Sequence, residues 1–261
     1  MGTNGRASWA VSPTSHRSTT LAVHKIGECM VQTVDKTQLR DAATVIVLRD
    51  RRVAPKILMG QRGSRAAFMP NKFVFPGGAL DAADEHVPLQ GKLPDLCASR
   101  LRDDVATDLA HALCVAAIRE LWEETGLVLG QKAVWPDAPE DWKGFAATGH
   151  RPDASALQFV FRAITPPGRP RRFDARFFLV DADRVASDLD DFSAACDELS
   201  HLQWVALPDA RRFDMPFITE VVLAEIEAQI ENPHVPVSVP FFKNNDEESL
   251  FLRLNGRALP D

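Results

Sequence analysis

The stretch RELWEETGL (Arg119–Leu127) constrains the chain most, because it places three glutamates within five residues of a helical pattern. This pattern predicts a helix from Asp103 to Glu124, which Gly126 ends as a helix C-cap glycine does. At about 100° per residue, the glutamates share one arc of about 100° and apolar residues occupy the opposite arc. The sequence therefore predicts a helix that packs on a sheet and presents a bare acidic stripe made of Glu120, Glu123 and Glu124.

This acidic stripe breaks two local rules of helix stability. Carboxylates spaced i, i+4 repel each other, and negative charge is unfavourable near a helix C-terminus. Violations of this kind indicate function, and a hard divalent cation would relieve them, because carboxylate oxygens suit Mg²⁺ or Mn²⁺ better than Zn²⁺. Three glutamates alone would favour a solvated acidic face, but the neighbouring Arg119, Gly126 and an upstream glycine turn favour a metal site.

The upstream turn lies in FVFPGGALDAAD (Phe73–Asp84), among segments that suggest a mixed fold. Apolar, β-branched runs predict strands at 43–49, 56–62 and 73–75, the first two as a hairpin. A loop is expected at 84–102, and a second helical region followed by an arginine-bearing loop at 139–172. Because strands and helices interleave without a regular βαβ repeat, the pattern favours an α+β fold over a doubly wound sheet.

Both stretches resemble the Nudix hydrolase signature. RELWEETGL matches R-E-U-x-E-E-x-G-U, where U is a bulky aliphatic residue, and GGALDAAD resembles the first half, G-x5-E, with Asp84 in place of glutamate. The resemblance covers about 41–230. It implies a Nudix-type mixed β-sheet sandwiched between α-helices, and Mg²⁺- or Mn²⁺-dependent cleavage of nucleoside diphosphates linked to another moiety.

The resemblance also implies roles for individual residues. Arg119 would be catalytic with the three glutamates and would orient them through a salt bridge to Asp84, for which Glu85 is a rival. Gly77 and Gly126 would support the site. The implied metal ligands are Glu120, Glu123, Glu124 and the carbonyl of Gly78.

The signature is interrupted, because Asp84 and Arg119 lie 35 positions apart. An insertion of about 27 residues, placed at about 86–110, costs little closure entropy because that cost grows only logarithmically with loop length. An interrupted box resembles the subgroup related to peroxisomal coenzyme A diphosphatases. The implied reaction is hydrolysis of coenzyme A or acyl-CoA to phosphopantetheine and 3′,5′-ADP. The alternatives are a hydrolase of ADP-ribose, a dinucleotide or a modified nucleoside triphosphate, and a non-catalytic nucleotide sensor.

A phosphate-bearing substrate needs basic residues focused locally, since the chain carries a net charge of -6. Arg62 and Arg65, which precede the glycine turn, are the first candidates for phosphate contacts. Arg172 is a candidate of second rank. Glu198 is a candidate for a further metal ligand or base, against the alternative of a strand-edge glutamate without such a role.

The composition limits which kinds of protein this chain can be. The 261 residues are 45% hydrophobic and 25% charged, which is typical of a globular protein. The acidic balance argues against a nucleic acid polymer as partner, and no apolar run is long enough for a membrane span. Four scattered cysteines favour the cytoplasm. We expect a disordered leader at 1–38, or alternatively an organelle-targeting leader, and a single domain at 39–261; a homodimer is left open.

Overall fold

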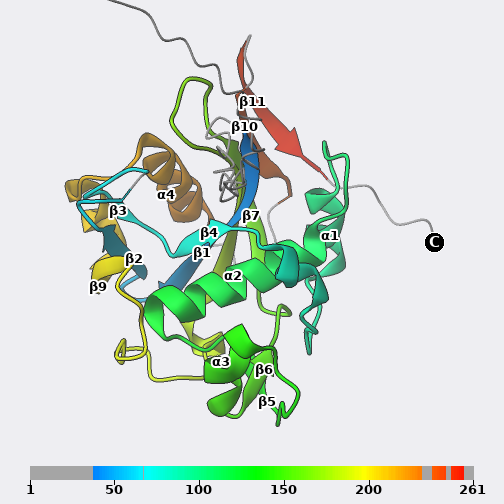
Figure 1. The fold of residues 1–261 in the computed structure, drawn as a ribbon. Coiled ribbons are helices and arrows are strands. Elements are labelled where there is room, and N and C mark those ends of the chain that lie inside the picture. Colours follow the sequence, from blue (N-terminus) through cyan, green and yellow to red (C-terminus); the bar gives the residue numbers. More distant parts are fainter. Residues whose placement is uncertain (1–37, 67, 231–236, 245–247, 256–261) are drawn as a thin grey trace, which may run out of the picture. The chain divides into compact units, whose positions relative to one another are not determined.

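A large mixed β-sheet is the centre of the computed structural model, which describes residues 38–66, 68–230, 237–244 and 248–255 (Figure 1). The sheet path is β11 (Ser249–Leu254), β10 (Val239–Asn244), β7 (Gln158–Ile164), β8 (Arg172–Asp181), β1 (Leu39–Arg49), β2 (Lys56–Arg62) and β3 (Phe73–Val74). Off this path, β4 (Gly77–Ala79) pairs with β1 and β9 (Leu199–Ala206) pairs with β2. Strand β1 lies parallel to β8, β10 lies parallel to β7, and the other pairs are antiparallel.

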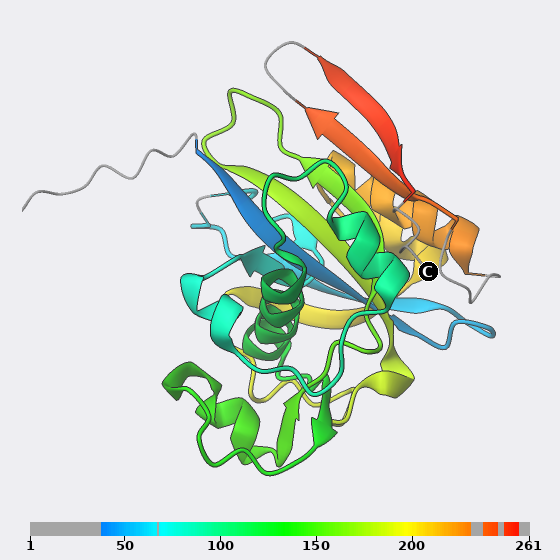
Figure 2. The same cartoon turned by 90° about the vertical axis from the view of Figure 1, so that its right-hand side faces the viewer.

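Helices cover both faces of this sheet (Figure 2). Residues of β1 alternate, so that Val45 and Val47 pack under α2 (Ala110–Thr125) while Ile46 and Leu48 face the core beneath α4 (Phe217–Gln229). This alternation is what a strand buried on both faces requires. The expected α+β fold with a sheet between helices is therefore confirmed.

The remaining elements are short. They comprise a second sheet of two strands, four 3₁₀-helices and two short α-helices within the described residues. These elements are η1 (Ala82–His86), α1 (Asp95–Leu101), β5 (Gly130–Lys132), η2 (Glu140–Trp142), α3 (Lys143–Ala147), β6 (His150–Pro152), η3 (Ala182–Arg184) and η4 (Leu207–Arg212). Within the described part of the chain, no helix has the length and apolar character needed to cross a membrane.

Three expectations from the sequence are wrong in detail. The expected loop at 84–102 contains η1 and α1. The long helix begins at Ala110 instead of Asp103, because Asp104 has a left-handed φ of 56° and the carbonyls of Asp103 and Asp104 accept hydrogen bonds from Arg162. In the region 139–172 the helix is only α3, and β6 and β7 follow it. The leader expected at 1–38 falls, but for its last residue, outside the described residues.

The inserted segment packs on the sheet at β7 and β10. Arg100 of α1 is buried and donates to the carbonyl of Val237 at 2.6 Å, and Lys243 pairs with Asp104 at 2.6 Å. Because Arg162 also holds the two carbonyls at 103 and 104, the insertion is fixed at several points to strands that come much later in the chain.

Candidate active site

The last turns of α2 position the three glutamates. The helix ends at Gly126, whose φ of 75° is left-handed and whose N–H donates to the Trp122 carbonyl at 2.8 Å. Glu120 and Glu124 are buried, and only Glu123 is half-exposed, with 40% of its side chain accessible. The expected bare acidic stripe is therefore wrong for two of the three glutamates, because the glycine turn that precedes η1 covers them.

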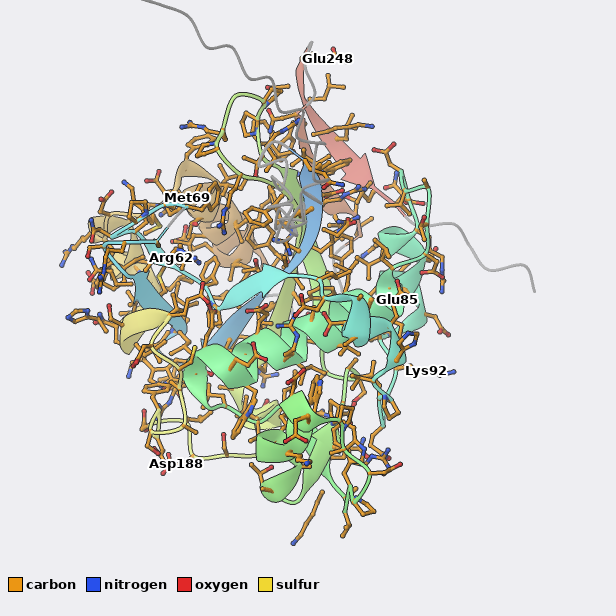
Figure 3. All side chains as sticks on the ribbon, viewed as in Figure 1. Arg62, Met69, Glu85, Lys92, Asp188 and Glu248 are labelled. Carbon is orange, nitrogen blue, oxygen red and sulfur yellow. The ribbon has the colours of Figure 1, made fainter. Side chains whose placement is uncertain are left out.

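Arg119 joins the two halves of the motif across the insertion. Its Nε lies 3.0 Å from Asp84 Oδ1 and its Nη2 lies 3.1 Å from Asp84 Oδ2, so the contact is bidentate. Asp84 is 1% exposed, whereas its rival Glu85 lies at the surface (Figure 3). Arg119 also donates from Nη1 to Glu120 at 2.8 Å and to Glu123 at 3.2 Å. One guanidinium thus holds three carboxylates.

The glycine turn contacts the same glutamates through its backbone. The N–H of Gly77 donates to Glu124 Oε2 at 2.7 Å. A Cβ atom added to Gly78 would lie 2.3 Å from Glu120 Oε1, and one added to Gly77 would lie 2.5 Å from the carbonyl oxygen of Ala43. Both glycines therefore allow an approach that any side chain would block.

Burial sets the electrostatics of this cluster. It raises the pKa of Glu120 to about 7, although the charge and hydrogen bond of Arg119 lower it. Burial and the charge of Glu120 also raise the pKa of Glu124 well above its ordinary value, against the Gly77 hydrogen bond. Burial alone would lower the pKa of Arg119, but hydrogen bonding to Asp84 and the surrounding carboxylates raise it overall. The cluster therefore carries more acid than its single arginine neutralises.

The donor set fits a hard divalent cation. Glu124 Oε1 is buried and has no hydrogen-bond partner among the described residues, so one carboxylate oxygen remains available. The surrounding donors are all oxygens, which suit Mg²⁺ or Mn²⁺. In the described ranges no three His, Cys, Asp or Glu side chains already converge as a ligand cluster. Arg119 engages one oxygen each of Glu120 and Glu123.

This chain resembles one known protein in sequence and another in fold. A Caenorhabditis elegans protein whose name assigns it to the nudix hydrolases is 26% identical over 236 residues, covering 79% of this chain and 70% of its own. A NUDIX hydrolase from Alicyclobacillus acidocaldarius superposes with a TM-score of 0.53 at 24% identity, over 77% of this chain and 99% of its own. Sequence and fold together support the Nudix hydrolase family.

A further structural neighbour is less similar, and one comparison found no match. The NUDIX domain of Shewanella oneidensis NrtR, described as a complex with ADP ribose, matches with a TM-score of 0.44 at 12% identity, over 74% of this chain and 89% of its own. No protein-family model matches the chain. The Caenorhabditis elegans relative and the Alicyclobacillus acidocaldarius structure are both named as nudix hydrolases.

The Nudix box also contains three contacts that we did not predict from the sequence. Arg119 Nη2 donates to the carbonyl of Ala79 at 3.0 Å and lies 3.8 Å from Asp81. The N–H of Asp81 in turn donates to Asp84 Oδ2 at 2.8 Å. The sequence did contain a signal for the Asp81–Asp84 contact. Asp81 lies three residues before Asp84, which is the spacing of a capping box.

Gly78 offers a test of how closely the Nudix box is packed. In Gly78→Ala the new methyl group would displace the flexible Glu120 carboxylate, so we expect kcat to fall about tenfold or more with little change in melting temperature. In Gly77→Ala the methyl group would meet the backbone of β1 instead, so this variant should lose stability. Turnover and thermal unfolding of both variants check this contrast; equal melting temperatures would contradict it.

The candidate substrate residues fall in different places. Arg62 ends β2 beside the box, and its Nη2 lies 2.9 Å from Glu198 Oε1. Arg65 is exposed in the loop after β2. Arg172 begins β8, five residues before Phe177, which is level with Thr44 and Gly77 in the sheet. That separation is about 17 Å along a strand, so Arg172 does not join the glutamates.

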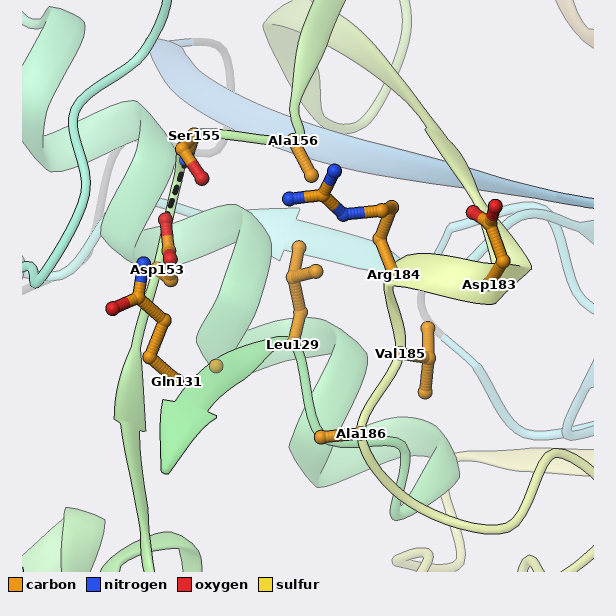
Figure 4. Close-up of a pocket in the computed structure, with 10 residues that line it drawn as sticks. Leu129, Gln131, Asp153, Ser155, Ala156, Asp183, Arg184, Val185 and Ala186 are labelled. Carbon is orange, nitrogen blue, oxygen red and sulfur yellow. Dashed lines mark hydrogen bonds between the residues drawn. The ribbon is translucent and has the colours of Figure 1, made fainter. Parts of the chain in front are cut away.

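A pocket of about 290 Å³ lies beyond the end of α2, between β5 and the loop that follows η3 (Figure 4). Arg184 extends into it, and Asp153 accepts a hydrogen bond from the N–H of Ser155 at its wall. None of the residues expected at the active site lines this pocket. It is therefore separate from the Nudix box.

Proposed function

We propose that this chain hydrolyses the pyrophosphate bond of a nucleoside diphosphate derivative with Mg²⁺ or Mn²⁺. The observation that carries the proposal is the bidentate Arg119–Asp84 pair, which closes the box across the insertion while Glu124 keeps an unpartnered buried oxygen. A sensor would not need this concentration of buried acid, since each buried carboxylate costs stability unless a cation compensates it.

Each box residue has a part in this proposal. Glu120, Glu123 and Glu124 would hold the cation together with the Gly78 carbonyl. A cation bound there would lower the pKa of a water molecule and stabilise charge on the phosphate oxygens. Arg119 orients Glu120 and Glu123, and Asp84 fixes the plane of its guanidinium. The proposed reaction adds water across a P–O–P bond and releases two phosphorylated products.

The preferred substrate is coenzyme A or acyl-CoA, which would yield phosphopantetheine, or its acylated form, and 3′,5′-ADP. Its support is the interrupted box, which resembles the subgroup related to peroxisomal coenzyme A diphosphatases. Arg65, exposed in the loop after β2, is the proposed phosphate contact. Hydrolysis of ADP-ribose or of a dinucleotide is the second candidate, because the buried glutamates serve any pyrophosphate equally well.

A substrate panel tests the proposal. Purified protein with Mg²⁺ or Mn²⁺ should release 3′,5′-ADP from coenzyme A faster than it cleaves ADP-ribose, NADH or diadenosine polyphosphates, as measured by mass spectrometry of the products. A chelator should abolish the reaction. Faster cleavage of another substrate would replace coenzyme A, and ligand binding without any cleavage would favour the sensor.

A further inference from the structure

An ion pair beside the box links two residues that the family signature does not include. Antiparallel pairing of β2 with β9 sets Arg62 opposite Leu199, which brings the preceding Glu198 next to the guanidinium. The Nη2–Oε1 distance is 2.9 Å, and 18% of the Arg62 side chain and 52% of the Glu198 side chain are exposed. Arg62 Nε is buried without a hydrogen-bond partner among the described residues, so only the outer end of the guanidinium is available for contacts.

This pair lies close to the helix that carries the buried glutamates, because β9 packs against α2. The segment that carries Glu198 is also fixed to the end of α2, because the N–H of Cys196 donates to the Glu123 carbonyl at 2.7 Å. Glu198 therefore keeps a defined position relative to the box.

We propose that Arg62 is a positioning residue, which holds Glu198 as a fourth carboxylate at the edge of the box instead of binding a substrate phosphate. Without a cationic partner, Glu198 would be repelled by the nearby glutamates and would turn toward solvent. Because Nη2 of Arg62 already donates to Glu198, only part of its guanidinium would be left for a phosphate. The inference rests on the proposed pyrophosphohydrolase activity.

A double-mutant cycle in turnover tests this role. Arg62→Met should lower kcat about 10-fold to 100-fold with KM nearly unchanged, because a misplaced group affects the chemical step more than substrate binding. Arg62→Lys should recover part of the loss. On the Glu198→Gln background, Arg62→Met should have no further effect on kcat, since Arg62 would act only through Glu198. A rise in KM of similar size on both backgrounds would overturn the proposal in favour of a phosphate contact.

The matched control is Arg65→Met, which removes an exposed arginine three residues away. It should raise KM and leave kcat almost unchanged, the opposite of Arg62→Met. Equal melting temperatures of Arg62→Met, Arg65→Met and Glu198→Gln would show that the losses of turnover do not come from unfolding. Loss of kcat in Arg62→Met that persists in full on the Glu198→Gln background would also overturn the proposal.

A second readout does not depend on turnover. In the metal-binding step, Arg62→Met should weaken Mn²⁺ binding severalfold because Glu198 would turn away from the box, and Glu198→Gln should weaken it to a similar degree. Electron paramagnetic resonance of free Mn²⁺ measures both changes, and Arg65→Met should leave the affinity unaltered. Identical Mn²⁺ affinities in all variants would overturn the placement of the pair at the box. If the unmodified protein binds Mn²⁺ but cleaves no pyrophosphate, the proposed function fails while this measurement still stands.

Discussion

Arg119→Met should lower the free energy of unfolding by about 3–5 kcal/mol, because it would leave buried carboxylates without their compensating charge. Asp84 is 1% exposed and both of its oxygens contact Arg119, so it would lose its cationic partner entirely. Glu120 and Glu123 would lose a donor as well. Urea denaturation followed by circular dichroism measures the change, and the melting temperature should fall by about 10 °C.

Arg102→Met is the matched control for that experiment. Arg102 also pairs with an aspartate, Asp108, at 2.7 Å, but about half of each side chain is exposed, at 50% and 52%. An exposed pair contributes about 0–1 kcal/mol, so this variant should be nearly as stable as the parent protein. Similar losses in the two variants would show that the Arg119 cluster contributes no more than an ordinary surface pair.

Glu124→Gln should lower kcat about 100-fold or more and abolish stabilisation by Mn²⁺. The substitution removes the charge of the least exposed glutamate, whose Oε1 is the available ligand oxygen, while an amide oxygen can still accept the Gly77 hydrogen bond. Losing a few kcal/mol of cation-dependent stabilisation corresponds to a rate loss of this size. Turnover and the rise in melting temperature on adding Mn²⁺ measure the two effects.

Glu85→Gln provides the comparison for Glu124→Gln. Glu85 is an exposed glutamate next to Asp84, so its neutralisation removes the same charge without touching the buried cluster. We expect kcat and the Mn²⁺-dependent rise in melting temperature to stay at the parent values. A comparable loss in Glu85→Gln would place the cation at the surface instead of against Glu124.

Local sequence was sufficient to place the end of α2 and the glycine turn, and it was insufficient for the insertion. Three glutamates at helical spacing, the C-cap glycine and the glycine turn depend on backbone geometry within a few residues, which residue types determine directly. Helix α1 has only seven residues, and it is stabilised by burying Cys97, Arg100 and Leu101 against distant strands. Short helices of this kind carry little local signal, because tertiary packing supplies most of their stability.

The same reasoning explains which polar residues were hard to place. Arg62 and Arg172 look alike in the sequence, but sheet register brings the first beside Glu198 and leaves the second far along β8. The burial of Glu120 and Glu124 also depends on how β4 pairs with β1. Register is a property of the assembled sheet, so these distinctions required the structure.

The docking of residues 95–104 on later strands has a consequence for the order in which the protein folds. Every box residue has been synthesised by Leu127, yet the partners that hold the insertion lie at Arg162, Val237 and Lys243. Contacts between segments so distant in sequence form slowly, and N-terminal parts of a chain emerge first. A nascent chain that stops before Val237 would thus contain Arg119 and Asp84, which join the two halves of the box, while the insertion would still lack its partners at Val237 and Lys243. The insertion is expected to dock last, together with the C-terminal hairpin.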